Sequence, residues 1–299
     1  MVMAVIGIGS NSVRMLLAEA AEGKLRRIRR NRAGTRLFAG LDERHNLSAQ
    51  AMLTTIASVE KMASDARACG VQAIHLFATS AVRDAANQAE FSQLLLERTG
   101  LTLEICSGEE EAALSFLGAS GGGDCGVIDI GGGSTEIIVG EGENVRCALS
   151  CQMGAVRLAG QYPIRDHADL GHVEAAADEI LCQQLALHPA LTLPPRWFGT
   201  GGTFTTLAAM VRSVHWTDRT FMHGTVLTLQ QVEKTARLLA NMSLEERRQL
   251  PGLQPNRADI IVHGICILLS CMRRLGIVEI TVSEYGNLEG YVKSRYHVQ

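Results

Sequence analysis

Two acidic side chains flank a glycine-rich turn near the middle of the chain and could act together on one cation. Asp129 and Glu136 stand on either side of Gly131-Gly132-Gly133-Ser134. The apolar runs around this turn predict a buried hairpin that would aim both carboxylates at one point. Acids are rarely buried unless they are paired or bind a cation. Because Mg²⁺ prefers carboxylate, water and phosphate oxygens, the pattern predicts a metal site at these two acids.

An imperfect copy of the same pattern stands near the N-terminus. The segment VIGIGSNSVR (Val5–Arg14) repeats in part the later segment VIDIGGGSTEI (Val127–Ile137). Glycine lets the backbone approach a ligand closely, and consecutive N–H groups in such a turn form an anion-binding concavity. Two such hairpins predict two similar lobes that hold a phosphate chain between them. The phosphate-binding candidates in these turns are Gly9, Ser10, Asn11, Ser12, Gly131, Gly132, Gly133 and Ser134.

A third glycine-rich segment, GTGGT (Gly199–Thr203), follows a predicted strand that ends at Phe198. A helix is predicted to begin directly after it. This order places N–H groups and the positive end of a helix dipole beside an anion. The sequence therefore adds Gly201, Gly202 and Thr203 to the phosphate-binding candidates.

Patterns typical of other nucleotide or metal sites are absent or incomplete. No GxxxxGK[ST] occurs, which excludes a P-loop NTPase. Gly7–Ser12 imitates a dinucleotide-binding fingerprint, but its third glycine is replaced by Ser12, and a strand follows, which disfavours a dehydrogenase. The histidines show no HxxH or HExxH spacing and the cysteines no CxxC. Cys147 and Cys151 leave a metal pair open, although a structural role is favoured because further ligands are missing.

Glu111 and Arg83 are further candidates, each with two interpretations. Glu111 ends a run of three acids at the start of a predicted helix, where acids commonly complement the helix dipole. It could instead act as a general base, a role that depends on geometry. Arg83 follows a predicted strand and could clamp a phosphate bidentately. Its alternative role is an ordinary ion pair with Asp84.

Basic side chains crowd a predicted strand near residue 30. Strict alternation along this strand predicts Arg26, Arg30 and Arg32 on one face and Arg27 and Arg29 on the other. A solvated edge strand is the favoured interpretation, because Lys and Arg commonly blunt sheet edges. The alternative is a surface that binds a polyanion.

Composition limits the class of protein. The 299 residues allow one large or two ordinary domains. With 46% apolar and 20% charged residues and a net charge of −3, nothing points to nucleic acid or an anionic membrane as a partner. No apolar run reaches the roughly 18 residues of a membrane span. The start of the chain shows no signal-peptide pattern, so we expect a reduced, cytoplasmic protein.

The predicted elements alternate in both halves of the chain, which indicates a mixed α/β sheet in each. A glycine-rich segment at 120–124 marks the predicted boundary. Strands are predicted at 2–9, 13–20, 24–32, 74–78, 101–106, 126–130, 134–139, 144–150 and 277–283, with one more ending at 198. Helices are predicted at 47–68, 84–99, 109–118, 155–161, 170–186, 230–241, 260–272 and 287–296.

Together these motifs resemble the exopolyphosphatase/guanosine pentaphosphatase (Ppx/GppA) family of the actin–hexokinase–Hsp70 superfamily, over nearly the whole chain. The matching motifs are GIGSNS (Gly7–Ser12), ATSAVRDA (Ala78–Ala85), SGEEEA (Ser107–Ala112), VIDIGGGSTE (Val127–Glu136), GTGGT (Gly199–Thr203), LPGLQPNRADII (Leu250–Ile261) and SEYGNLEG (Ser283–Gly290). The resemblance implies the short form of the family, with two similar actin-like (ribonuclease-H-like) lobes and a cleft between them. We expect lobes at 1–120 and 121–284, and a terminal helix within 285–299 that packs back on the first lobe.

The resemblance also implies roles for the candidate residues. Glu111 matches the catalytic glutamate that activates water, and Arg83 matches a substrate-contacting arginine. Asp129 and Glu136 match the acids associated with Mg²⁺, or Mn²⁺ in its place. The implied reaction is hydrolysis of the terminal phosphoanhydride of inorganic polyphosphate or of guanosine pentaphosphate (pppGpp), by in-line attack of water. The resemblance implies a homodimer.

Two departures from the family pattern keep alternatives open. Gly7 stands where the family has an aspartate, and Asn287-Leu288 replaces the usual residues before Glu289-Gly290. The loss of a carboxylate at position 7 motivates a second hypothesis, a catalytically weak regulator that binds polyphosphate or guanosine tetra- and pentaphosphates. A small-molecule kinase is a third, but no sequence feature supplies an acceptor pocket.

Overall fold

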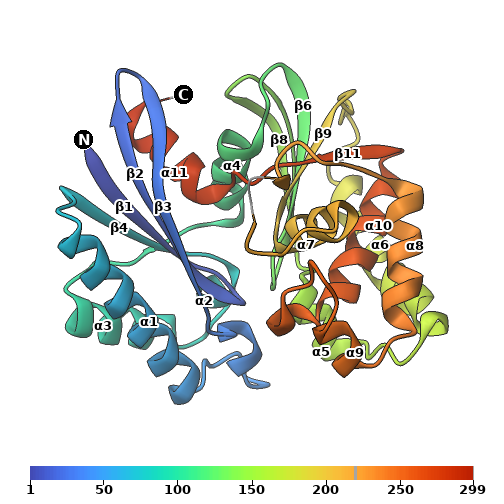
Figure 1. Ribbon diagram of the computed structural model, residues 1–299, viewed down its shortest axis with the longest axis horizontal. Helices are drawn as coiled ribbons and strands as arrows, with labels where there is room; N and C mark the ends of the chain where they lie inside the picture. The colour runs from blue at the N-terminus through green and yellow to red at the C-terminus, as the bar shows by residue number, and fades with distance from the viewer. Residues whose placement is uncertain (219–220, 299) are drawn as a thin grey trace. The chain divides into compact units, whose positions relative to one another are not determined.

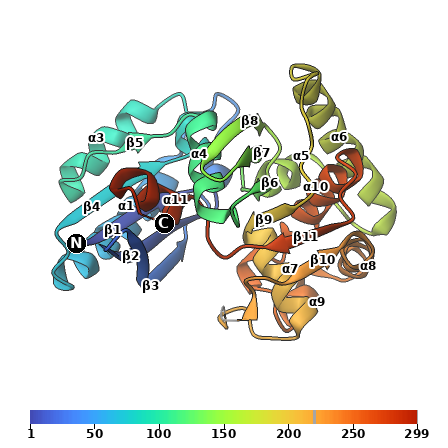
Figure 2. The same cartoon turned by 90° about the horizontal axis from the view of Figure 1, so that it is seen from above.

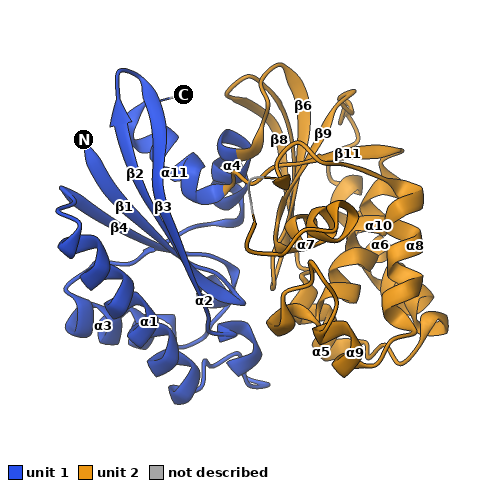
Figure 3. Ribbon diagram, in the orientation of Figure 1, with its two compact units in different colours: residues 1–118, 287–299 blue, residues 119–286 orange. Residues whose placement is uncertain are grey.

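The computed structural model describes residues 1–218 and 221–298, which divide into two compact units (Figures 1 and 3). Unit 1 comprises Met1–Gly118 together with the C-terminal segment from Asn287, and unit 2 comprises Ala119–Gly286. The division falls just before the glycine-rich segment 120–124. The last residue of the predicted terminal segment 285–299 lies outside the described residues.

Unit 1 is built on a five-stranded sheet in the order β3-β2-β1-β4-β5. Its strands are β1 (Val2–Ile8), β2 (Ser12–Ala21), β3 (Lys24–Gly34), β4 (Ala73–Ala78) and β5 (Glu104–Ile105). The first three form an antiparallel meander, whereas β4 and β5 run parallel to β1. Because parallel strands end at the same edge of a sheet, the segments that follow β1, β4 and β5 emerge close together.

Helices cover both faces of this sheet. On one face, α1 (Ala49–Ala68) and α3 (Gln88–Thr99) share a core with alternate residues of β1 and β2. On the other face, α11 (Asn287–Tyr296) packs on the intervening residues. Figure 2 shows this helix, from the far end of the chain, beside the strands of unit 1. Ser48 caps α1 by accepting a hydrogen bond from the Ala51 amide, as its position before the helical pattern predicts.

The single helix predicted at 84–99 was too long. The structure has a short α2 (Ser80–Arg83), a break, and then α3. The break is tied to a distant segment, because the Asn87 side chain bonds both the backbone N–H and C=O of Leu47, at 2.8 and 3.1 Å. These bonds join residues that are far apart in the sequence. The local pattern of apolar residues therefore does not reveal where the helix begins.

Strand β3 contains a β-bulge that local alternation does not reveal. Leu17 of β2 pairs with Arg29, but the next residue, Ala18, pairs with Arg27, which leaves Ile28 as the extra residue. One extra residue in a strand reverses the faces of all residues beyond it. The faces predicted from strict alternation therefore cannot hold on both sides of Ile28.

The bulge brings Arg27 and Arg30 to the face that α11 covers. Both reach Glu289 of α11, Arg30 as a close ion pair and Arg27 at 3.8 Å. Glu289 is fully buried. The prediction that Arg26 shares a face with Arg30, and that Arg27 lies on the opposite face, was wrong. Arg26 bonds Glu19 across the strand pair instead.

Replacing Arg30 by Met should lower the free energy of unfolding by about 3 kcal/mol, because it leaves the buried Glu289 carboxylate without its closest cation. Urea denaturation measures this change. The matched control is Arg29→Met on the same strand: Arg29 is exposed and bonds only Asn31 within the described part of the chain. The control should change stability by less than about 0.5 kcal/mol. Similar losses in both variants would contradict the anchoring role of Arg30.

Unit 2 contains a six-stranded sheet in the order β10-β11-β9-β6-β7-β8. The strands are β6 (Asp124–Ile130), β7 (Thr135–Glu141), β8 (Asn144–Cys151), β9 (Trp197–Gly201), β10 (Val226–Thr228) and β11 (Glu279–Val282). Again a three-stranded antiparallel meander, β6 to β8, is followed by a strand parallel to its first member, β9. The predicted fold class, two similar mixed sheets flanked by helices, is confirmed.

The helices of unit 2 surround α10, whose residues 261–272 are all buried. Helices α6 and α8 pack directly on it, as Figure 1 shows. The longer helical elements are α4 (Gly108–Ala119, across the division), α5 (Ala155–Gln161), α6 (Leu170–Ala186), α7 (Gly202–Arg212), α8 (Leu229–Ala240), α9 (Leu244–Arg248) and α10 (Ile261–Arg274). Short 3₁₀ helices lie at η1 (Leu37–Gly40), η2 (His167–Asp169) and η4 (Pro255–Arg257). β10 and α9 were not predicted.

Within the described residues, none of the helices combines the length and apolar character needed to cross a membrane.

Candidate functional site

The glycine turn between β6 and β7 presents unused backbone donors. The Gly131 amide bonds the Ser134 carbonyl at 3.0 Å and closes the turn. The carbonyls of Gly131 and Gly132 accept bonds from the first amides of α5, at 3.0 and 2.9 Å. The N–H groups of Gly132 and Gly133 donate to no other group among the described residues. Such free, neighbouring N–H groups are what an anion requires.

Asp129 and Glu136 lie directly opposite each other on β6 and β7. Directly opposed residues of an antiparallel pair place their side chains on the same face. Both are buried, with 8% and 1% exposure. Glu136 accepts a hydrogen bond from Ser150 at 3.0 Å. Gly201 lies against Asp129, since a Cβ there would be 2.9 Å from Asp129 Oδ1. The structure thus brings the predicted carboxylate pair together beside the third glycine segment.

Asp129 and Glu136 suit a magnesium ion whose remaining ligands are phosphate oxygens and water. No cluster of three or more His, Cys, Asp or Glu able to hold a metal ion occurs in residues 1–218 and 221–298. Mg²⁺ is commonly held by one or two carboxylates, with phosphate oxygens and water as the other ligands. Asp129 and Glu136 supply this donor set. Among the described residues, Cys147 and Cys151 belong to no group of three or more potential metal ligands.

The third glycine segment joins β9 to α7 and is covered by an arginine. Gly201 has φ +97°, a conformation that L side chains rarely adopt, and precedes the first turn of α7. The Arg257 guanidinium lies so close to Gly202 that a Cβ there would stand 1.8 Å from Nη1. A helix N-terminus with an adjacent cation favours anions. Arg257 belongs to a motif of the family resemblance, Leu250–Ile261, but the sequence did not predict a role for it.

In unit 1, the turn between β1 and β2 repeats this construction. The Gly9 amide bonds the Ser12 carbonyl at 3.1 Å, as Gly131 bonds Ser134. The carbonyls of Ser10 and Asn11 accept backbone bonds from residues 35–38. The buried Asn11 Oδ1 has no hydrogen-bond partner within the described residues. The turn therefore contains one buried polar atom, Asn11 Oδ1, that is left unsatisfied by the described residues.

The first hairpin lacks the carboxylate pair of the second. Gly7 and Arg14 pair across β1 and β2 at the positions that Asp129 and Glu136 occupy in unit 2. A Cβ at Gly7 would lie 3.0 Å from the Phe77 ring and 3.1 Å from Leu288. Arg14 bonds Asn287 of α11 at 3.1 Å. Apolar side chains thus lie against position 7, where the family resemblance led us to expect an aspartate.

Glu111 and Arg83 form an ion pair in unit 1. Arg83 Nη1 donates to Glu111 Oε2 at 3.0 Å and to the Cys106 carbonyl at 3.1 Å, whereas Asp84 lies 3.7 Å from Arg83 Nε. Glu111 is only 7% exposed. Arg83 Nη2 is buried and has no partner among the described residues. The Glu111 carboxylate, fixed by its bond to Arg83 Nη1, can accept a proton. Arg83 Nη2 can at the same time donate a hydrogen bond to an anionic oxygen.

The order of the strands explains why this pair lies next to the first glycine turn. Ile8 pairs with Ala78, and Ala78 pairs with Ile105, so that three parallel strands end at one edge. The residues just beyond meet there: Ser10 and Ser80 hydroxyls are 2.9 Å apart. Ligands of α/β sheets commonly bind at the carboxyl ends of strands. Glu111, Arg83 and the turn from Gly9 to Ser12 therefore form one cluster within unit 1.

Cys106, the cysteine nearest to this cluster, is not a nucleophile. Burial, reinforced by the Glu111 carboxylate, raises the pKa of its thiol to about 12. Because only the thiolate is reactive, Cys106 stays inert near neutral pH. A covalent intermediate on Cys106 is therefore disfavoured.

Comparisons with known proteins identify the family of this chain. The sequence model of the Ppx/GppA phosphatase family matches residues 16–298. Exopolyphosphatase 2 of Mycobacterium tuberculosis is 32% identical over 315 residues, covering 98% of each chain. The crystal structure of the Aquifex aeolicus Ppx/GppA family member is 29% identical, with a TM-score of 0.83 over 99% of this chain and 98% of that one.

A crystal structure of an exopolyphosphatase from Cytophaga hutchinsonii has a TM-score of 0.88 over 100% of this chain and 99% of that one. At 23% identity, it supports the fold alone. The family match spans nearly all of the chain, and the Mycobacterium relative spans it at matching length. The chain therefore belongs to the Ppx/GppA phosphatase family.

Proposed function

We propose that this protein is an exopolyphosphatase that hydrolyses the terminal phosphoanhydride of inorganic polyphosphate and releases orthophosphate. The observation that carries this proposal is the buried Glu111–Arg83 ion pair beside the glycine turn of unit 1. Membership of the Ppx/GppA family and the name of the Mycobacterium relative support the same substrate.

Each residue has a role that follows from its chemistry. Glu111 takes the proton of the attacking water, and Arg83 orients Glu111 while its unused Nη2 contacts a phosphate oxygen. The glycine turns donate N–H groups to phosphate oxygens, which stabilises the charge that develops during transfer. Asp129 and Glu136 would hold Mg²⁺ or Mn²⁺, which neutralises phosphate charge when bound.

Hydrolysis of pppGpp is the second proposed activity, because its terminal phosphoanhydride is chemically equivalent to that of polyphosphate. The deciding experiment measures orthophosphate release with Mg²⁺ from long-chain polyphosphate and from pppGpp in parallel. We expect turnover of polyphosphate, and the ratio of the two kcat/KM values defines the preference. No turnover of either by a folded enzyme, together with thermal stabilisation by one of them, would replace the proposal by a binding regulator.

We further propose that the enzyme acts in the cytoplasm as a homodimer, as the sequence and the family resemblance led us to expect. Light scattering of the purified protein at several concentrations tests whether it is a homodimer. A mass equal to a single chain at all concentrations would remove it.

Replacing Gly154 by Ala should lower polyphosphate hydrolysis by about 10²-fold, because a displacement of about 1 Å at a catalytic centre has that effect. The new Cβ would stand 2.3 Å from the Gly132 carbonyl and 2.4 Å from the Gly133 amide nitrogen, and so would push the turn away. The matched control is Gly160→Ala in α5, the helix that Gly154 precedes, where a Cβ meets no atom within 4 Å. Initial rates and circular dichroism of both variants provide the measurement; equal rates would argue against the turn as a phosphate site.

A further inference from the structure

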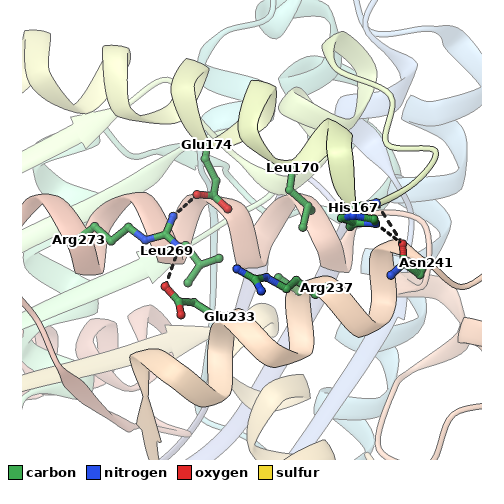
Figure 4. A pocket seen from close by; sticks show the side chains of 9 residues that line it. His167, Leu170, Glu174, Glu233, Arg237, Asn241, Leu269 and Arg273 are labelled. Atoms are coloured by element: carbon green, nitrogen blue, oxygen red, sulfur yellow. Dashed lines mark hydrogen bonds and ion pairs between the residues drawn. The ribbon is translucent and has the colours of Figure 1, made fainter.

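Unit 2 contains a pocket of about 480 Å³ between α6, α8 and α10, and none of the three glycine segments contributes to it (Figure 4). This volume lies within the range of small-molecule sites in proteins. The pocket also lies outside every motif to which the proposed hydrolysis assigns a role. Its chemistry can therefore be considered on its own.

The floor of the pocket is apolar. Leu170 of α6, Ala236 of α8 and Leu269 of α10 line it and are all buried in the core of unit 2. A ligand with a compact apolar body would remove its own apolar surface from water here. The polar groups of the pocket stand around this floor, as Figure 4 shows.

At one end, an arginine satisfies both acids of the pocket. Arg273 donates to Glu174 in a close ion pair and to Glu233 at 2.7 Å. Both carboxylates are therefore already paired with Arg273. A cationic ligand would have to compete with Arg273 for both of them.

Arg237 keeps its guanidinium N–H donors unused among the described residues, although its charge acts on the Glu174 carboxylate. It lies one helical turn after Glu233 on α8, a spacing at which Glu and Arg ordinarily pair. Glu233 bonds Arg273 instead, and the Arg237 guanidinium makes no hydrogen bond or ion pair within the described residues. In Figure 4 this guanidinium points along the pocket, between Glu233 and Leu170. Its fork of N–H donors suits a carboxylate or phosphate.

The other end of the pocket offers a second donor. The backbone N–H of His167 and its Nδ1 both bond Asn241 Oδ1, at 3.3 and 2.9 Å. Since a backbone N–H can only donate, the Asn241 oxygen must face His167, and its NH₂ group faces away. Across residues 1–218 and 221–298, no acceptor is bonded to that NH₂ group. The Asn241 NH₂ group and the Arg237 guanidinium thus both offer hydrogen-bond donors to the pocket.

We propose that this pocket binds a small organic anion. Its carboxylate or phosphate is held by Arg237, a second acceptor bonds the Asn241 amide, and its apolar body lies on Leu170, Ala236 and Leu269. The proposal is independent of the phosphatase activity, because it rests only on residues of α6, α8, α10 and η2.

The test measures binding of four probes that share an aromatic body and differ in charge. Saturation-transfer NMR and calorimetry compare benzoate and phenylphosphonate with neutral benzamide and cationic benzamidine. We expect the two anions to bind with Kd of about 1 mM or below, and the other two to bind at least about tenfold more weakly. Benzamidine binding as tight as benzoate, or no binding of either anion, would overturn the proposal.

Variants of one side chain locate the binding site. Arg237→Gln should weaken both anions about tenfold or more, and Arg237→Lys should recover part of the loss because it restores the charge but not the fork. Since Arg237 is exposed and unbonded, neither variant should perturb folding. The matched control is Arg248→Gln on α9, which removes an exposed arginine outside the pocket. Unchanged anion binding in Arg237→Gln would place the anions elsewhere, for example at the glycine turns, and would also overturn the proposal.

Discussion

Replacing Glu111 by Gln should lower the rate of orthophosphate release from polyphosphate by about 10²- to 10⁴-fold, the usual contribution of a general base. Gln has nearly the size of Glu and can still accept a hydrogen bond from Arg83 Nη1, so the local geometry persists. It cannot take a proton from water. The loss should therefore appear in kcat, while thermal stability and polyphosphate binding change little.

The control for this variant lies in the same helical turn. Glu109 is exposed at the start of α4, and Glu109→Gln should leave kcat within about twofold of the wild type, as expected for a surface substitution. Steady-state rates of both variants, with circular dichroism to verify folding, make the comparison. If Glu111→Gln retained the full wild-type rate, another residue would have to activate the water.

Replacing Asp129 by Asn should weaken the response to Mg²⁺ and the rate of hydrolysis together. Asn keeps the shape of Asp129 but removes one of the two buried charges that face each other across β6 and β7. We expect the Mg²⁺ concentration for half-maximal rate to rise about tenfold or more, because substitutions around metal sites commonly have effects of this size. Glu136→Gln should act in the same direction.

Direct metal binding separates this prediction from a general loss of activity. Titration with Mn²⁺, followed by electron paramagnetic resonance without substrate, should show weaker binding in Asp129→Asn. The matched control is Asp124→Asn at the start of the same strand, where the carboxylate is half-exposed and pairs with Arg146. An unchanged metal response in Asp129→Asn would remove the ligand assignment.

Much of each hairpin could be predicted because its signals are local. The turn from Gly131 to Ser134 closes through one bond between residues three apart, and the turn from Gly9 to Ser12 closes in the same way. The N-cap of α1 also depends on neighbouring residues. The short hairpin was enough to predict that Asp129 and Glu136 are aimed at one point, and the structure shows them paired directly across β6 and β7.

The bulge in β3 shows where local reasoning stops. Whether Ile28 is skipped depends on the register with β2, and the register depends on packing of both strands against α1 and α11. The cation that meets Glu289 is consequently decided by residues far away along the chain. For the same reason the helix predicted to begin at residue 84 begins only at Gln88, after Asn87, whose side chain bonds Leu47.

The amino-acid sequence alone established the two glycine hairpins, the alternating elements, the carboxylate pair and the family resemblance, because each rests on short-range pattern or motif. The tertiary structure decided which distant groups meet. It pairs Arg83 with Glu111, fills the space beside Gly7 with Phe77 and Leu288, and places Arg257 on Gly202. Such contacts depend on strand order and close packing of side chains, and neither is encoded in the spacing of residues along the chain.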